Sequence, residues 1–456
     1  MAKNIDSIFF DITPKIEELA LKCEQNNAIE KELYTKYEVK RGLRDLNGKG
    51  VLAGLTNISD VCASKIVDGK SVPCEGNLYY RGHNIKDLVR GFLEADHPGF
   101  EETAYLLLFG ELPNKAQLEE FQNMIAERRM LPPNFVRDVI MKAPSRDMMN
   151  SITRSILQLY SYDEKADDTS IPNVLRQCLN LISQFPMLMV YGYHAYNYRR
   201  GEDLYIYAPK AELSTAENIL MTLREDRKYT KLEAEILDMA LVLHMDHGGG
   251  NNSTFTTHVV TSSGTDTYST IAAAMASLKG PKHGGANLKV MEQLEHIRAG
   301  VENHTDEDEV REFLRKIIRR QEGDGSGLIY GMGHAVYTLS DPRAQILKTH
   351  AKSLAYKKGY DEEYEMLCSI ERLAPQVFTE EKHGPKKVCA NVDLFSGLIY
   401  RMLGISEDLF TPLFAIARVP GWCAHRVEEV EFANRIIRPA YQYVGHPQAY
   451  VALEER

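Results

Sequence analysis

The residues with the clearest chemical potential are histidines that lie among glycines. His283 stands in GPKHGGANLKVMEQL (residues 280–294), and the apolar spacing after it predicts a helix that starts beside the imidazole. Free N–H groups at a helix start lower the pKa of a nearby imidazole, and a neutral ring can donate a hydrogen bond to a developing negative oxygen. A glycine-rich turn with an incidental histidine is the other reading, and this stretch alone does not decide between them.

A second histidine among glycines is followed by an arginine. In GDGSGLIYGMGHAVYTLSDPRAQ (residues 323–345), His334 follows the glycines, and Arg343 stands near the start of a helix predicted by Asp341 as cap and Pro342. This pairing suits an anionic carbonyl compound, because a guanidinium pairs with a carboxylate while an imidazole polarises the carbonyl. The glycine spacing does not fit a dinucleotide-binding loop.

A third stretch, LVLHMDHGGGNNSTFTTHVV (residues 241–260), contains two histidines three residues apart. This spacing predicts that His244 and His247 share one face of a helix that the glycines end. The pair is compatible with a polar helix end, with a ligand site, or with metal chelation. Asp246 is present, but no second carboxylate pattern accompanies the pair, so we expect no metal site.

An aspartate and two arginines complete the candidate residues. Asp393 lies where an extended segment meets an apolar helix in VCANVDLFSGLIYRMLGI (residues 388–405). Such an aspartate is commonly a helix cap, although a partly desolvated carboxylate could also remove a proton from carbon. Arg418 stands inside an apolar run, where a guanidinium is costly to leave unpaired, and Arg438 precedes a proline.

The elements that would hold these residues are mostly helices. Residues 306–321 show the spacing of an amphipathic helix, Ser214 opens a capping box, and residues 361–378 predict a helix that stops near Pro375. Residues 63–82 predict a β-hairpin. The sequence therefore predicts an all-α protein with one small β-hairpin near the N-terminus.

Composition narrows the class of protein further. The chain has 456 residues, of which 44% are hydrophobic, and a net charge of −10, which argues against nucleic-acid binding through bulk electrostatics. The start of the chain does not read as a signal peptide, and no stretch is long enough for a membrane helix. The seven cysteines are scattered without a C-x-x-C pair, so we expect free thiols and a cytoplasmic protein.

The motifs stand in one order over about residues 240–440, and as an ordered set they resemble the citrate synthase family. The set comprises a His-x-x-His-Gly segment, Gly-Pro-x-His-Gly-x-Ala-Asn, Gly-x-Gly-His, Asp-Pro-Arg, Asn-Val-Asp-x-x-Ser-Gly and two later arginines 20 residues apart. The resemblance implies an acyltransferase that condenses acetyl-CoA with oxaloacetate and then hydrolyses citryl-CoA. It implies no cofactor beyond acetyl-CoA as a substrate.

The resemblance also assigns roles to individual residues. Asp393 matches the base that removes a methyl proton from acetyl-CoA, and His283 matches the donor to the enol or enolate oxygen. His334 matches the group that polarises the ketone of oxaloacetate and protonates the alkoxide. The residues that match the oxaloacetate ligands are His247, Arg343, Arg418 and Arg438.

The family fold implies a division of the chain into domains and a dimer. A large domain would comprise residues 1–284 and 405–456, and a small domain of residues 285–404 would close over the substrates. Arg438 would reach into the site of the partner subunit of a homodimer. Some positions depart from the family pattern, namely Ala335, Thr338 and Ala390, and leave the CoA phosphate contacts open, with Lys386 and Lys387 as substitutes or as plain solvated lysines.

Three alternatives remain open at this point. A 2-methylcitrate synthase performs the same chemistry on propionyl-CoA, and one methylene changes binding by only about 1–3 kcal/mol. A metal-dependent hydrolase would use His244, Asp246, His247 and His283. A non-catalytic homologue is disfavoured because the chain keeps every catalytic residue type.

Overall fold

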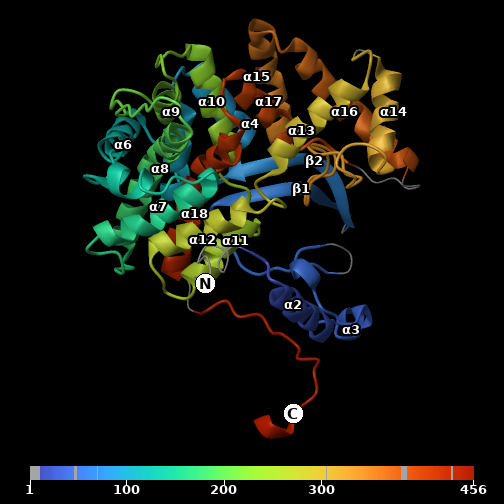
Figure 1. Cartoon of the computed structure of the whole chain (residues 1–456). Helices are drawn as coiled ribbons and strands as arrows, with labels where there is room; N and C mark the ends of the chain where they lie inside the picture. Colours follow the sequence, from blue (N-terminus) through green and yellow to red (C-terminus); the bar gives the residue numbers. More distant parts are fainter. Residues whose placement is uncertain (1–10, 46–48, 69, 305, 382–387, 433–434) are drawn as a thin grey trace. The chain divides into compact units, whose positions relative to one another are not determined.

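The computed structural model describes residues 11–45, 49–68, 70–304, 306–381, 388–432 and 435–456 (Figure 1). Contacts within the chain divide it into two units, Leu55–Ile437 and a smaller unit that combines Met1–Gly54 with Arg438–Arg456. The smaller unit contains α2 (Pro14–Asn26) and α3 (Lys31–Lys36), and its described C-terminal part is largely extended. Among the described residues, no helix combines the length and the hydropathy that crossing a lipid bilayer requires.

The larger unit is mostly helical and contains one small three-stranded sheet, which agrees with the predicted helical class and hairpin. Its helices are α4 (Ile85–Glu94), α5 (Gly99–Phe109), α6 (Lys115–Glu127), α7 (Met148–Leu159), α8 (Ile171–Arg199), α9 (Thr215–Leu223), α10 (Lys231–His244), α11 (Asn252–Thr261), α12 (Thr267–Lys279), α13 (Ala286–Gly300), α14 (Glu307–Ile318), α15 (Pro342–Lys358), α16 (Asp361–Glu381), α17 (Asp393–Met402) and α18 (Phe410–Phe432).

Helix α18 forms the centre of the core. Every residue from Phe410 to Arg426 is buried, so this part of the helix is covered on all sides, as expected of a mostly apolar stretch. It packs against α5, α7, α8, α10, α11 and α12. Because Arg418 is on this helix, its guanidinium is held inside the core rather than at the surface.

The predicted hairpin is present and begins slightly earlier than expected. Strand β1 (Ser59–Val67) pairs antiparallel with β2 (Lys70–Tyr80), which pairs with the short β3 (His83–Asn84). Tyr80 is fully buried, and its hydroxyl accepts the N–H of Asp246 at 3.1 Å. The hairpin therefore supports the turn that follows α10, which contains His247.

Helices α13 to α17 pack against one another and lie together on one side of the larger unit (Figure 1). Helix α14 begins after Asp306, and α15 begins with Asp341 as cap, as predicted. The prediction that the next helix stops near Pro375 is wrong, because α16 continues to Glu381. Buried side chains on both sides of the proline, such as Ile370 and Val377, hold the two halves on the core, and such packing outweighs one lost backbone hydrogen bond.

Candidate active site

The turn after α10 places His247 differently from the sequence prediction. Helix α10 ends at His244, so the two histidines do not share a helix face, and His247 lies in the turn beyond it. His244 Nδ1 lies 2.8 Å from the carbonyl oxygen of Ala240, to which it donates, and its own carbonyl accepts Arg418 Nε at 2.7 Å. His244 is therefore a buried structural residue that anchors Arg418, while the ring of His247 is left for other contacts.

His247, His334 and Tyr337 form an aromatic cluster. The ring centroids of His247 and His334 are 4.9 Å apart, and His334 stacks on Tyr337 at 4.7 Å. The Tyr337 hydroxyl donates to the carbonyl oxygen of Asn77 on β2 at 3.2 Å, which ties the cluster to the hairpin. The Nε2 atom of His247 is buried and has no hydrogen-bond partner among the described residues. This ring nitrogen is therefore available to a ligand.

The backbone fixes the protonation of His334. Its Nδ1 accepts the N–H groups of Val336 and Tyr337, each at 3.0 Å, so the proton of the neutral ring is on Nε2. Burial, assisted by the nearby positive charge of Arg343, lowers the pKa of His334 to about 4. At neutral pH the ring is an uncharged donor through Nε2, the form that polarises a carbonyl.

Two loops bring His334 and Asp393 together. Gly333 N donates to the carbonyl oxygen of Cys389 at 2.7 Å, and Asn391 N donates to that of Gly331 at 2.9 Å. Gly331 has a φ of +78°, and a Cβ there would lie 2.8 Å from a side-chain carbon of Leu394. Only glycine satisfies both constraints, so the glycines before His334 serve the close approach of the loop to the start of α17.

Asp393 is the first residue of α17 but does not cap it. The helix has no side-chain cap hydrogen bond, and the N–H of Asp393 is instead taken by Asn391 Oδ1 at 3.0 Å. Burial raises the pKa of Asp393 to about 6, against the opposing effects of Arg343 and Arg418. A carboxylate with a pKa near the working pH is suited to act as a general base.

The two arginines near this group are buried in different ways. Arg343 makes a bidentate pair with Asp341, with Nε 3.0 Å from Oδ1 and Nη2 2.7 Å from Oδ2. Arg418 is fully buried, yet its Nη1 atom has no hydrogen-bond partner among the described residues. Because an unpaired buried guanidinium is costly, Arg418 is poised to accept an anionic ligand.

His283 lies close enough to Arg418 for the charge of the guanidinium to act on its ring. It lies in a turn three residues before α13, so the helix starts later than the sequence predicted. Its Nε2 is 3.0 Å from Ser253 Oγ, which also accepts the indole N–H of Trp422 at 3.2 Å. Burial, together with the charge of Arg418, lowers the pKa of His283 to about 4. The ring is therefore neutral at physiological pH.

Some predicted residues are not brought to this site. Arg438 belongs to the smaller unit, so its relation to the site stays a prediction, and Lys386 and Lys387 lie outside the described residues. His244, Asp246, His247 and His283 do not form a candidate metal site in the part of the chain that the structure describes, which removes the support for the hydrolase. A cavity of about 680 Å³ lies between α4, α6, α9 and α10, and none of the predicted site residues lines it.

The structure also shows supporting residues that sequence reasoning missed. Ser253 and Trp422 contact His283 or its partner, and Tyr337 stacks on His334. Asp341 was predicted only as a helix cap, yet it both caps α15 and pairs with Arg343. The Asp-Pro-Arg spacing could have signalled this pair, whereas nothing in the sequence places Trp422 beside Ser253.

Comparisons with known proteins agree with this arrangement. Residues 45–440 match the family description "Citrate synthase, C-terminal domain". The chain is 38% identical to citrate synthase of Synechocystis sp. over 84% of this chain and 89% of the relative. A citrate synthase structure from Pyrobaculum aerophilum is 32% identical, with a TM-score of 0.73 over 91% of this chain and 95% of that one. A Thermoplasma acidophilum citrate synthase, solved as a ternary complex with carboxymethyl coenzyme A and oxaloacetate, is 28% identical, with a TM-score of 0.76 over 92% and 99%.

The similarity to citrate synthases over most of the chain shows that this protein is an enzyme of the acyltransferase class. The chain belongs to the citrate synthase family. The family also includes a 2-methylcitrate synthase of Shewanella oneidensis, which is 31% identical over 90% of this chain and 97% of the relative.

Proposed function

We propose that this protein condenses acetyl-CoA with oxaloacetate and hydrolyses the resulting citryl-CoA to citrate and CoA. Family membership supports the reaction, and one observation supports the assignment of the site. The neutral ring of His247 lies near Arg343 and Arg418, that of His334 lies near Arg343, and Arg418 has an unused buried donor. Asp341 already pairs with Arg343, but Arg418 Nη1 and His247 Nε2 have no partner among the described residues, and these unused groups fit a small dicarboxylate.

Oxaloacetate would be bound by charge and oriented by the imidazoles. Arg418 Nη1 and His247 Nε2 are buried and have no hydrogen-bond partner among the described residues, and Arg343 is held in place by Asp341. Carboxylates of the substrate would take the arginine donors, since such charge-assisted bonds are strong in a buried site. The ketone would then accept the Nε2–H of His334, which polarises it and later protonates the alkoxide.

The second substrate would be activated by Asp393 and His283. The carboxylate of Asp393 removes a methyl proton of acetyl-CoA, and its pKa of about 6 leaves it ionised at pH 7. The enolate oxygen would receive a hydrogen bond from the neutral ring of His283. The new C–C bond forms when the enolate carbon attacks the polarised ketone, and water then releases CoA from citryl-CoA.

For His283 to donate through Nδ1, its Nε2 must be an acceptor. Ser253 Oγ is 3.0 Å from this nitrogen and already receives the N–H of Trp422, so its hydroxyl proton points either at the ring or at Asn251 Oδ1. Asn251 Oδ1, 2.9 Å from the same hydroxyl, competes for that proton unless its amide is turned. The proposed role of His283 therefore depends on Ser253 as the residue that selects its tautomer.

We further propose that the protein is a cytoplasmic homodimer in which Arg438 completes the partner's site and a small domain of residues 285–404 closes over the substrates. Mutual packing of α13 to α17 supports the small domain. Tyr441 and Tyr450, which follow Arg438, are 96% and 84% exposed, as expected of a segment that a partner covers. Mixing Arg438→Ala with Asp393→Ala protein should restore activity only if subunits exchange and share sites.

A CoA-release assay with oxaloacetate tests the function directly. The acetyl-CoA reaction should be faster than the propionyl-CoA reaction at equal concentration, with citrate as the identified product. Faster release from propionyl-CoA would instead assign the chain to the 2-methylcitrate synthases of this family. No release from either thioester would contradict the proposed function.

A further inference from the structure

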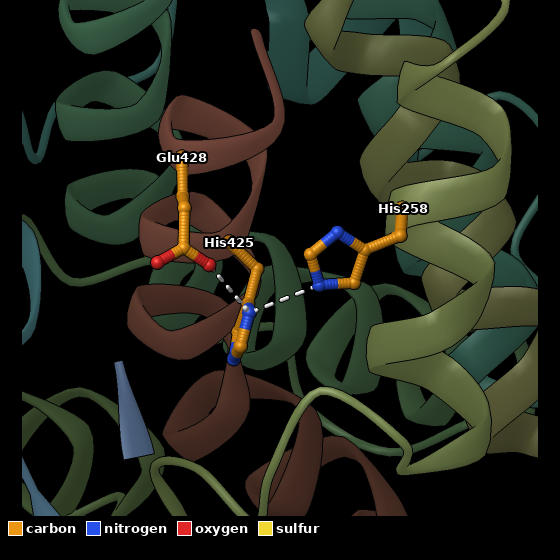
Figure 2. A group of neighbouring side chains, drawn as sticks. All are labelled: His258, His425 and Glu428. Carbon is orange, nitrogen blue, oxygen red and sulfur yellow. Dashed lines mark hydrogen bonds and ion pairs between the residues drawn. The ribbon is translucent and has the colours of Figure 1, made fainter. Parts of the chain in front are cut away.

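A second pair of histidines lies outside the candidate active site, and each ring has a carboxylate behind it. His258 is on α11 and His425 is on α18, and His258 Nε2 is 3.1 Å from His425 Nδ1 (Figure 2). On the far side of each ring, His258 Nδ1 is 2.6 Å from Glu429 Oε2, and His425 Nε2 is 3.2 Å from Asp246 Oδ2. The outer nitrogen of His258 therefore bonds to a carboxylate, and that of His425 lies beside one without a hydrogen bond to it among the described residues.

These carboxylates decide which nitrogens carry protons. An ionised carboxylate only accepts, so the nitrogen beside it holds the N–H of a neutral ring. The inner nitrogens, His258 Nε2 and His425 Nδ1, are then both lone pairs that point toward the same space. Two lone pairs at this distance repel each other, so either one ring carries a proton on its inner nitrogen or a cation lies beside both nitrogens. Histidines that bind metals usually have this carboxylate behind the outer nitrogen, since it fixes the tautomer and strengthens the ligand.

Glu428 supplies a third atom that points to the same place. Its Oε1 accepts the backbone N–H of Asn57 at 2.7 Å, while its Oε2 is buried without a hydrogen-bond partner among the described residues. That oxygen is 3.8 Å from His425 Nδ1, and one ligand atom from each of His258, His425 and Glu428 lies within 4.8 Å of the others. Figure 2 shows the three side chains converging from α11 and α18.

We propose that His258, His425 and Glu428 bind a Zn²⁺ ion. Two imidazole nitrogens and one carboxylate oxygen are a ligand set that zinc accepts, with a water in the fourth position. Tetrahedral bonds of about 2.0–2.2 Å would separate ligand atoms by about 3.3–3.6 Å, so only small side-chain movements are needed. A shared proton between the rings would satisfy their nitrogens but would leave Glu428 Oε2 without a donor.

The charge balance of the cluster favours a divalent cation over a single proton. Glu428 and Glu429 place two carboxylates beside the rings, and a third, that of the fully buried Asp246, lies behind the fully buried His425 and also interacts with Arg418. Gly249 leaves room beside the pair, because a Cβ at that position would lie 3.6 Å from His258 Nε2. The ion would tie α11 to α18 and, through Asp246, hold the turn before His247. Its role is structural, because none of its ligands is a proposed catalytic residue.

The test uses the full chain after removal of metal with a chelator. Titration calorimetry with ZnCl₂ should show one strong site per chain, and MgCl₂ should show none, because magnesium prefers oxygen ligands. Zn²⁺ should also raise the midpoint of thermal unfolding by a few degrees. Co²⁺ in place of zinc should give the visible absorption of a tetrahedral site without a sulfur-to-cobalt band, which separates this site from the cysteine thiols.

Variants locate the ion. Glu428→Gln keeps the oxygen that accepts Asn57 N–H but loses the anionic ligand, and it should weaken zinc binding at least tenfold. His258→Gln should do the same, and His296→Ala, which removes an exposed histidine of α13, should bind like wild type. Wild-type protein that takes up no zinc would overturn the proposal in favour of a shared proton. Equal binding by Glu428→Gln and wild type would overturn it in favour of a site elsewhere.

Discussion

The two histidine clusters of this protein each take one member from residues 247–258 but have opposite surroundings. His247 and His334 face the arginines Arg343 and Arg418, whereas His258 and His425 face carboxylates. In the first cluster burial lowers the pKa values of the two histidines, and the nearby arginines lower them further. The rings therefore stay neutral, and the arginines attract a substrate anion. In the second cluster the carboxylates provide negative charge that attracts a cation. The residue type alone therefore does not set the role of an imidazole, because its charged neighbours do.

Asp246 interacts with a residue beside each cluster, namely Arg418 and His425. Burial alone would raise its pKa, yet His425 and Arg418 hold that pKa below its ordinary range. Its Oδ1 accepts the N–H of Gly248 at 2.9 Å, and it also accepts the hydroxyl of Ser59 on β1. Gly421 allows α18 this close, since a Cβ there would lie 2.6 Å from Asp246 Oδ2. One carboxylate thus compensates an arginine of the first cluster and backs a histidine of the second.

The largest effect is expected from replacing Asp393, the proposed base of the candidate active site. Asp393→Asn should lower kcat/KM about 10²–10⁴-fold, because an amide cannot take the methyl proton. Oxaloacetate binding, measured by calorimetry, should persist, since Asp393 is not among its proposed ligands. Asp408→Asn, at an exposed position, is the control and should act like wild type. Activity of Asp393→Asn within a few-fold of wild type would remove Asp393 from the base role.

The next effect tests whether Asp246 links the two clusters. Asp246→Asn removes a buried charge that faces His425 and Arg418, and such a loss costs about 3–5 kcal/mol of unfolding free energy. Thermal and denaturant unfolding should show this loss, while Asp87→Asn on the surface of α4 should change stability little. Unfolding free energies that match for both variants would show that the clusters do not depend on the charge of Asp246.

The dependence of activity on pH should separate the base from the histidines. Asp393 has a pKa raised to about 6, so lowering the pH through 6 protonates it, and kcat/KM should fall about tenfold per pH unit below that value. His283 and His334, with pKa values lowered to about 4, are already neutral and should add no limb between pH 5 and 8. A limb that persists near pH 6 in Asp393→Asn would assign the titration to a histidine.

Sequence reasoning reached the helical class and the hairpin because both depend on local patterns. Capping at Asp341 and the alternation of residues 63–82 are encoded within a few residues. Two predictions from local signals were wrong. Helix α16 does not stop near Pro375, because tertiary packing stabilises it to Glu381, and His247 does not share a helix face with His244, because α10 ends at His244. The cluster of His258 and His425 was invisible, because its members are 167 positions apart and no motif joins them.

The smallest effect should come from the residue that orients His283. Ser253→Ala removes the hydroxyl 3.0 Å from His283 Nε2 and leaves the buried N–H of Trp422 without its acceptor. Without a donor at Nε2, the ring is free to carry its proton there, and the tautomer that donates through Nδ1 loses population. A free-energy change of about 1.4 kcal/mol between the tautomers lowers the population of the donating tautomer about tenfold. We therefore expect kcat to drop roughly tenfold. KM for oxaloacetate should change little, because Arg343 and Arg418 keep their contacts. Ser263→Ala, at an exposed position on a surface turn, is the matched control. A rise in KM for oxaloacetate without a fall in kcat would show that Ser253 supports the arginine cluster rather than the tautomer of His283.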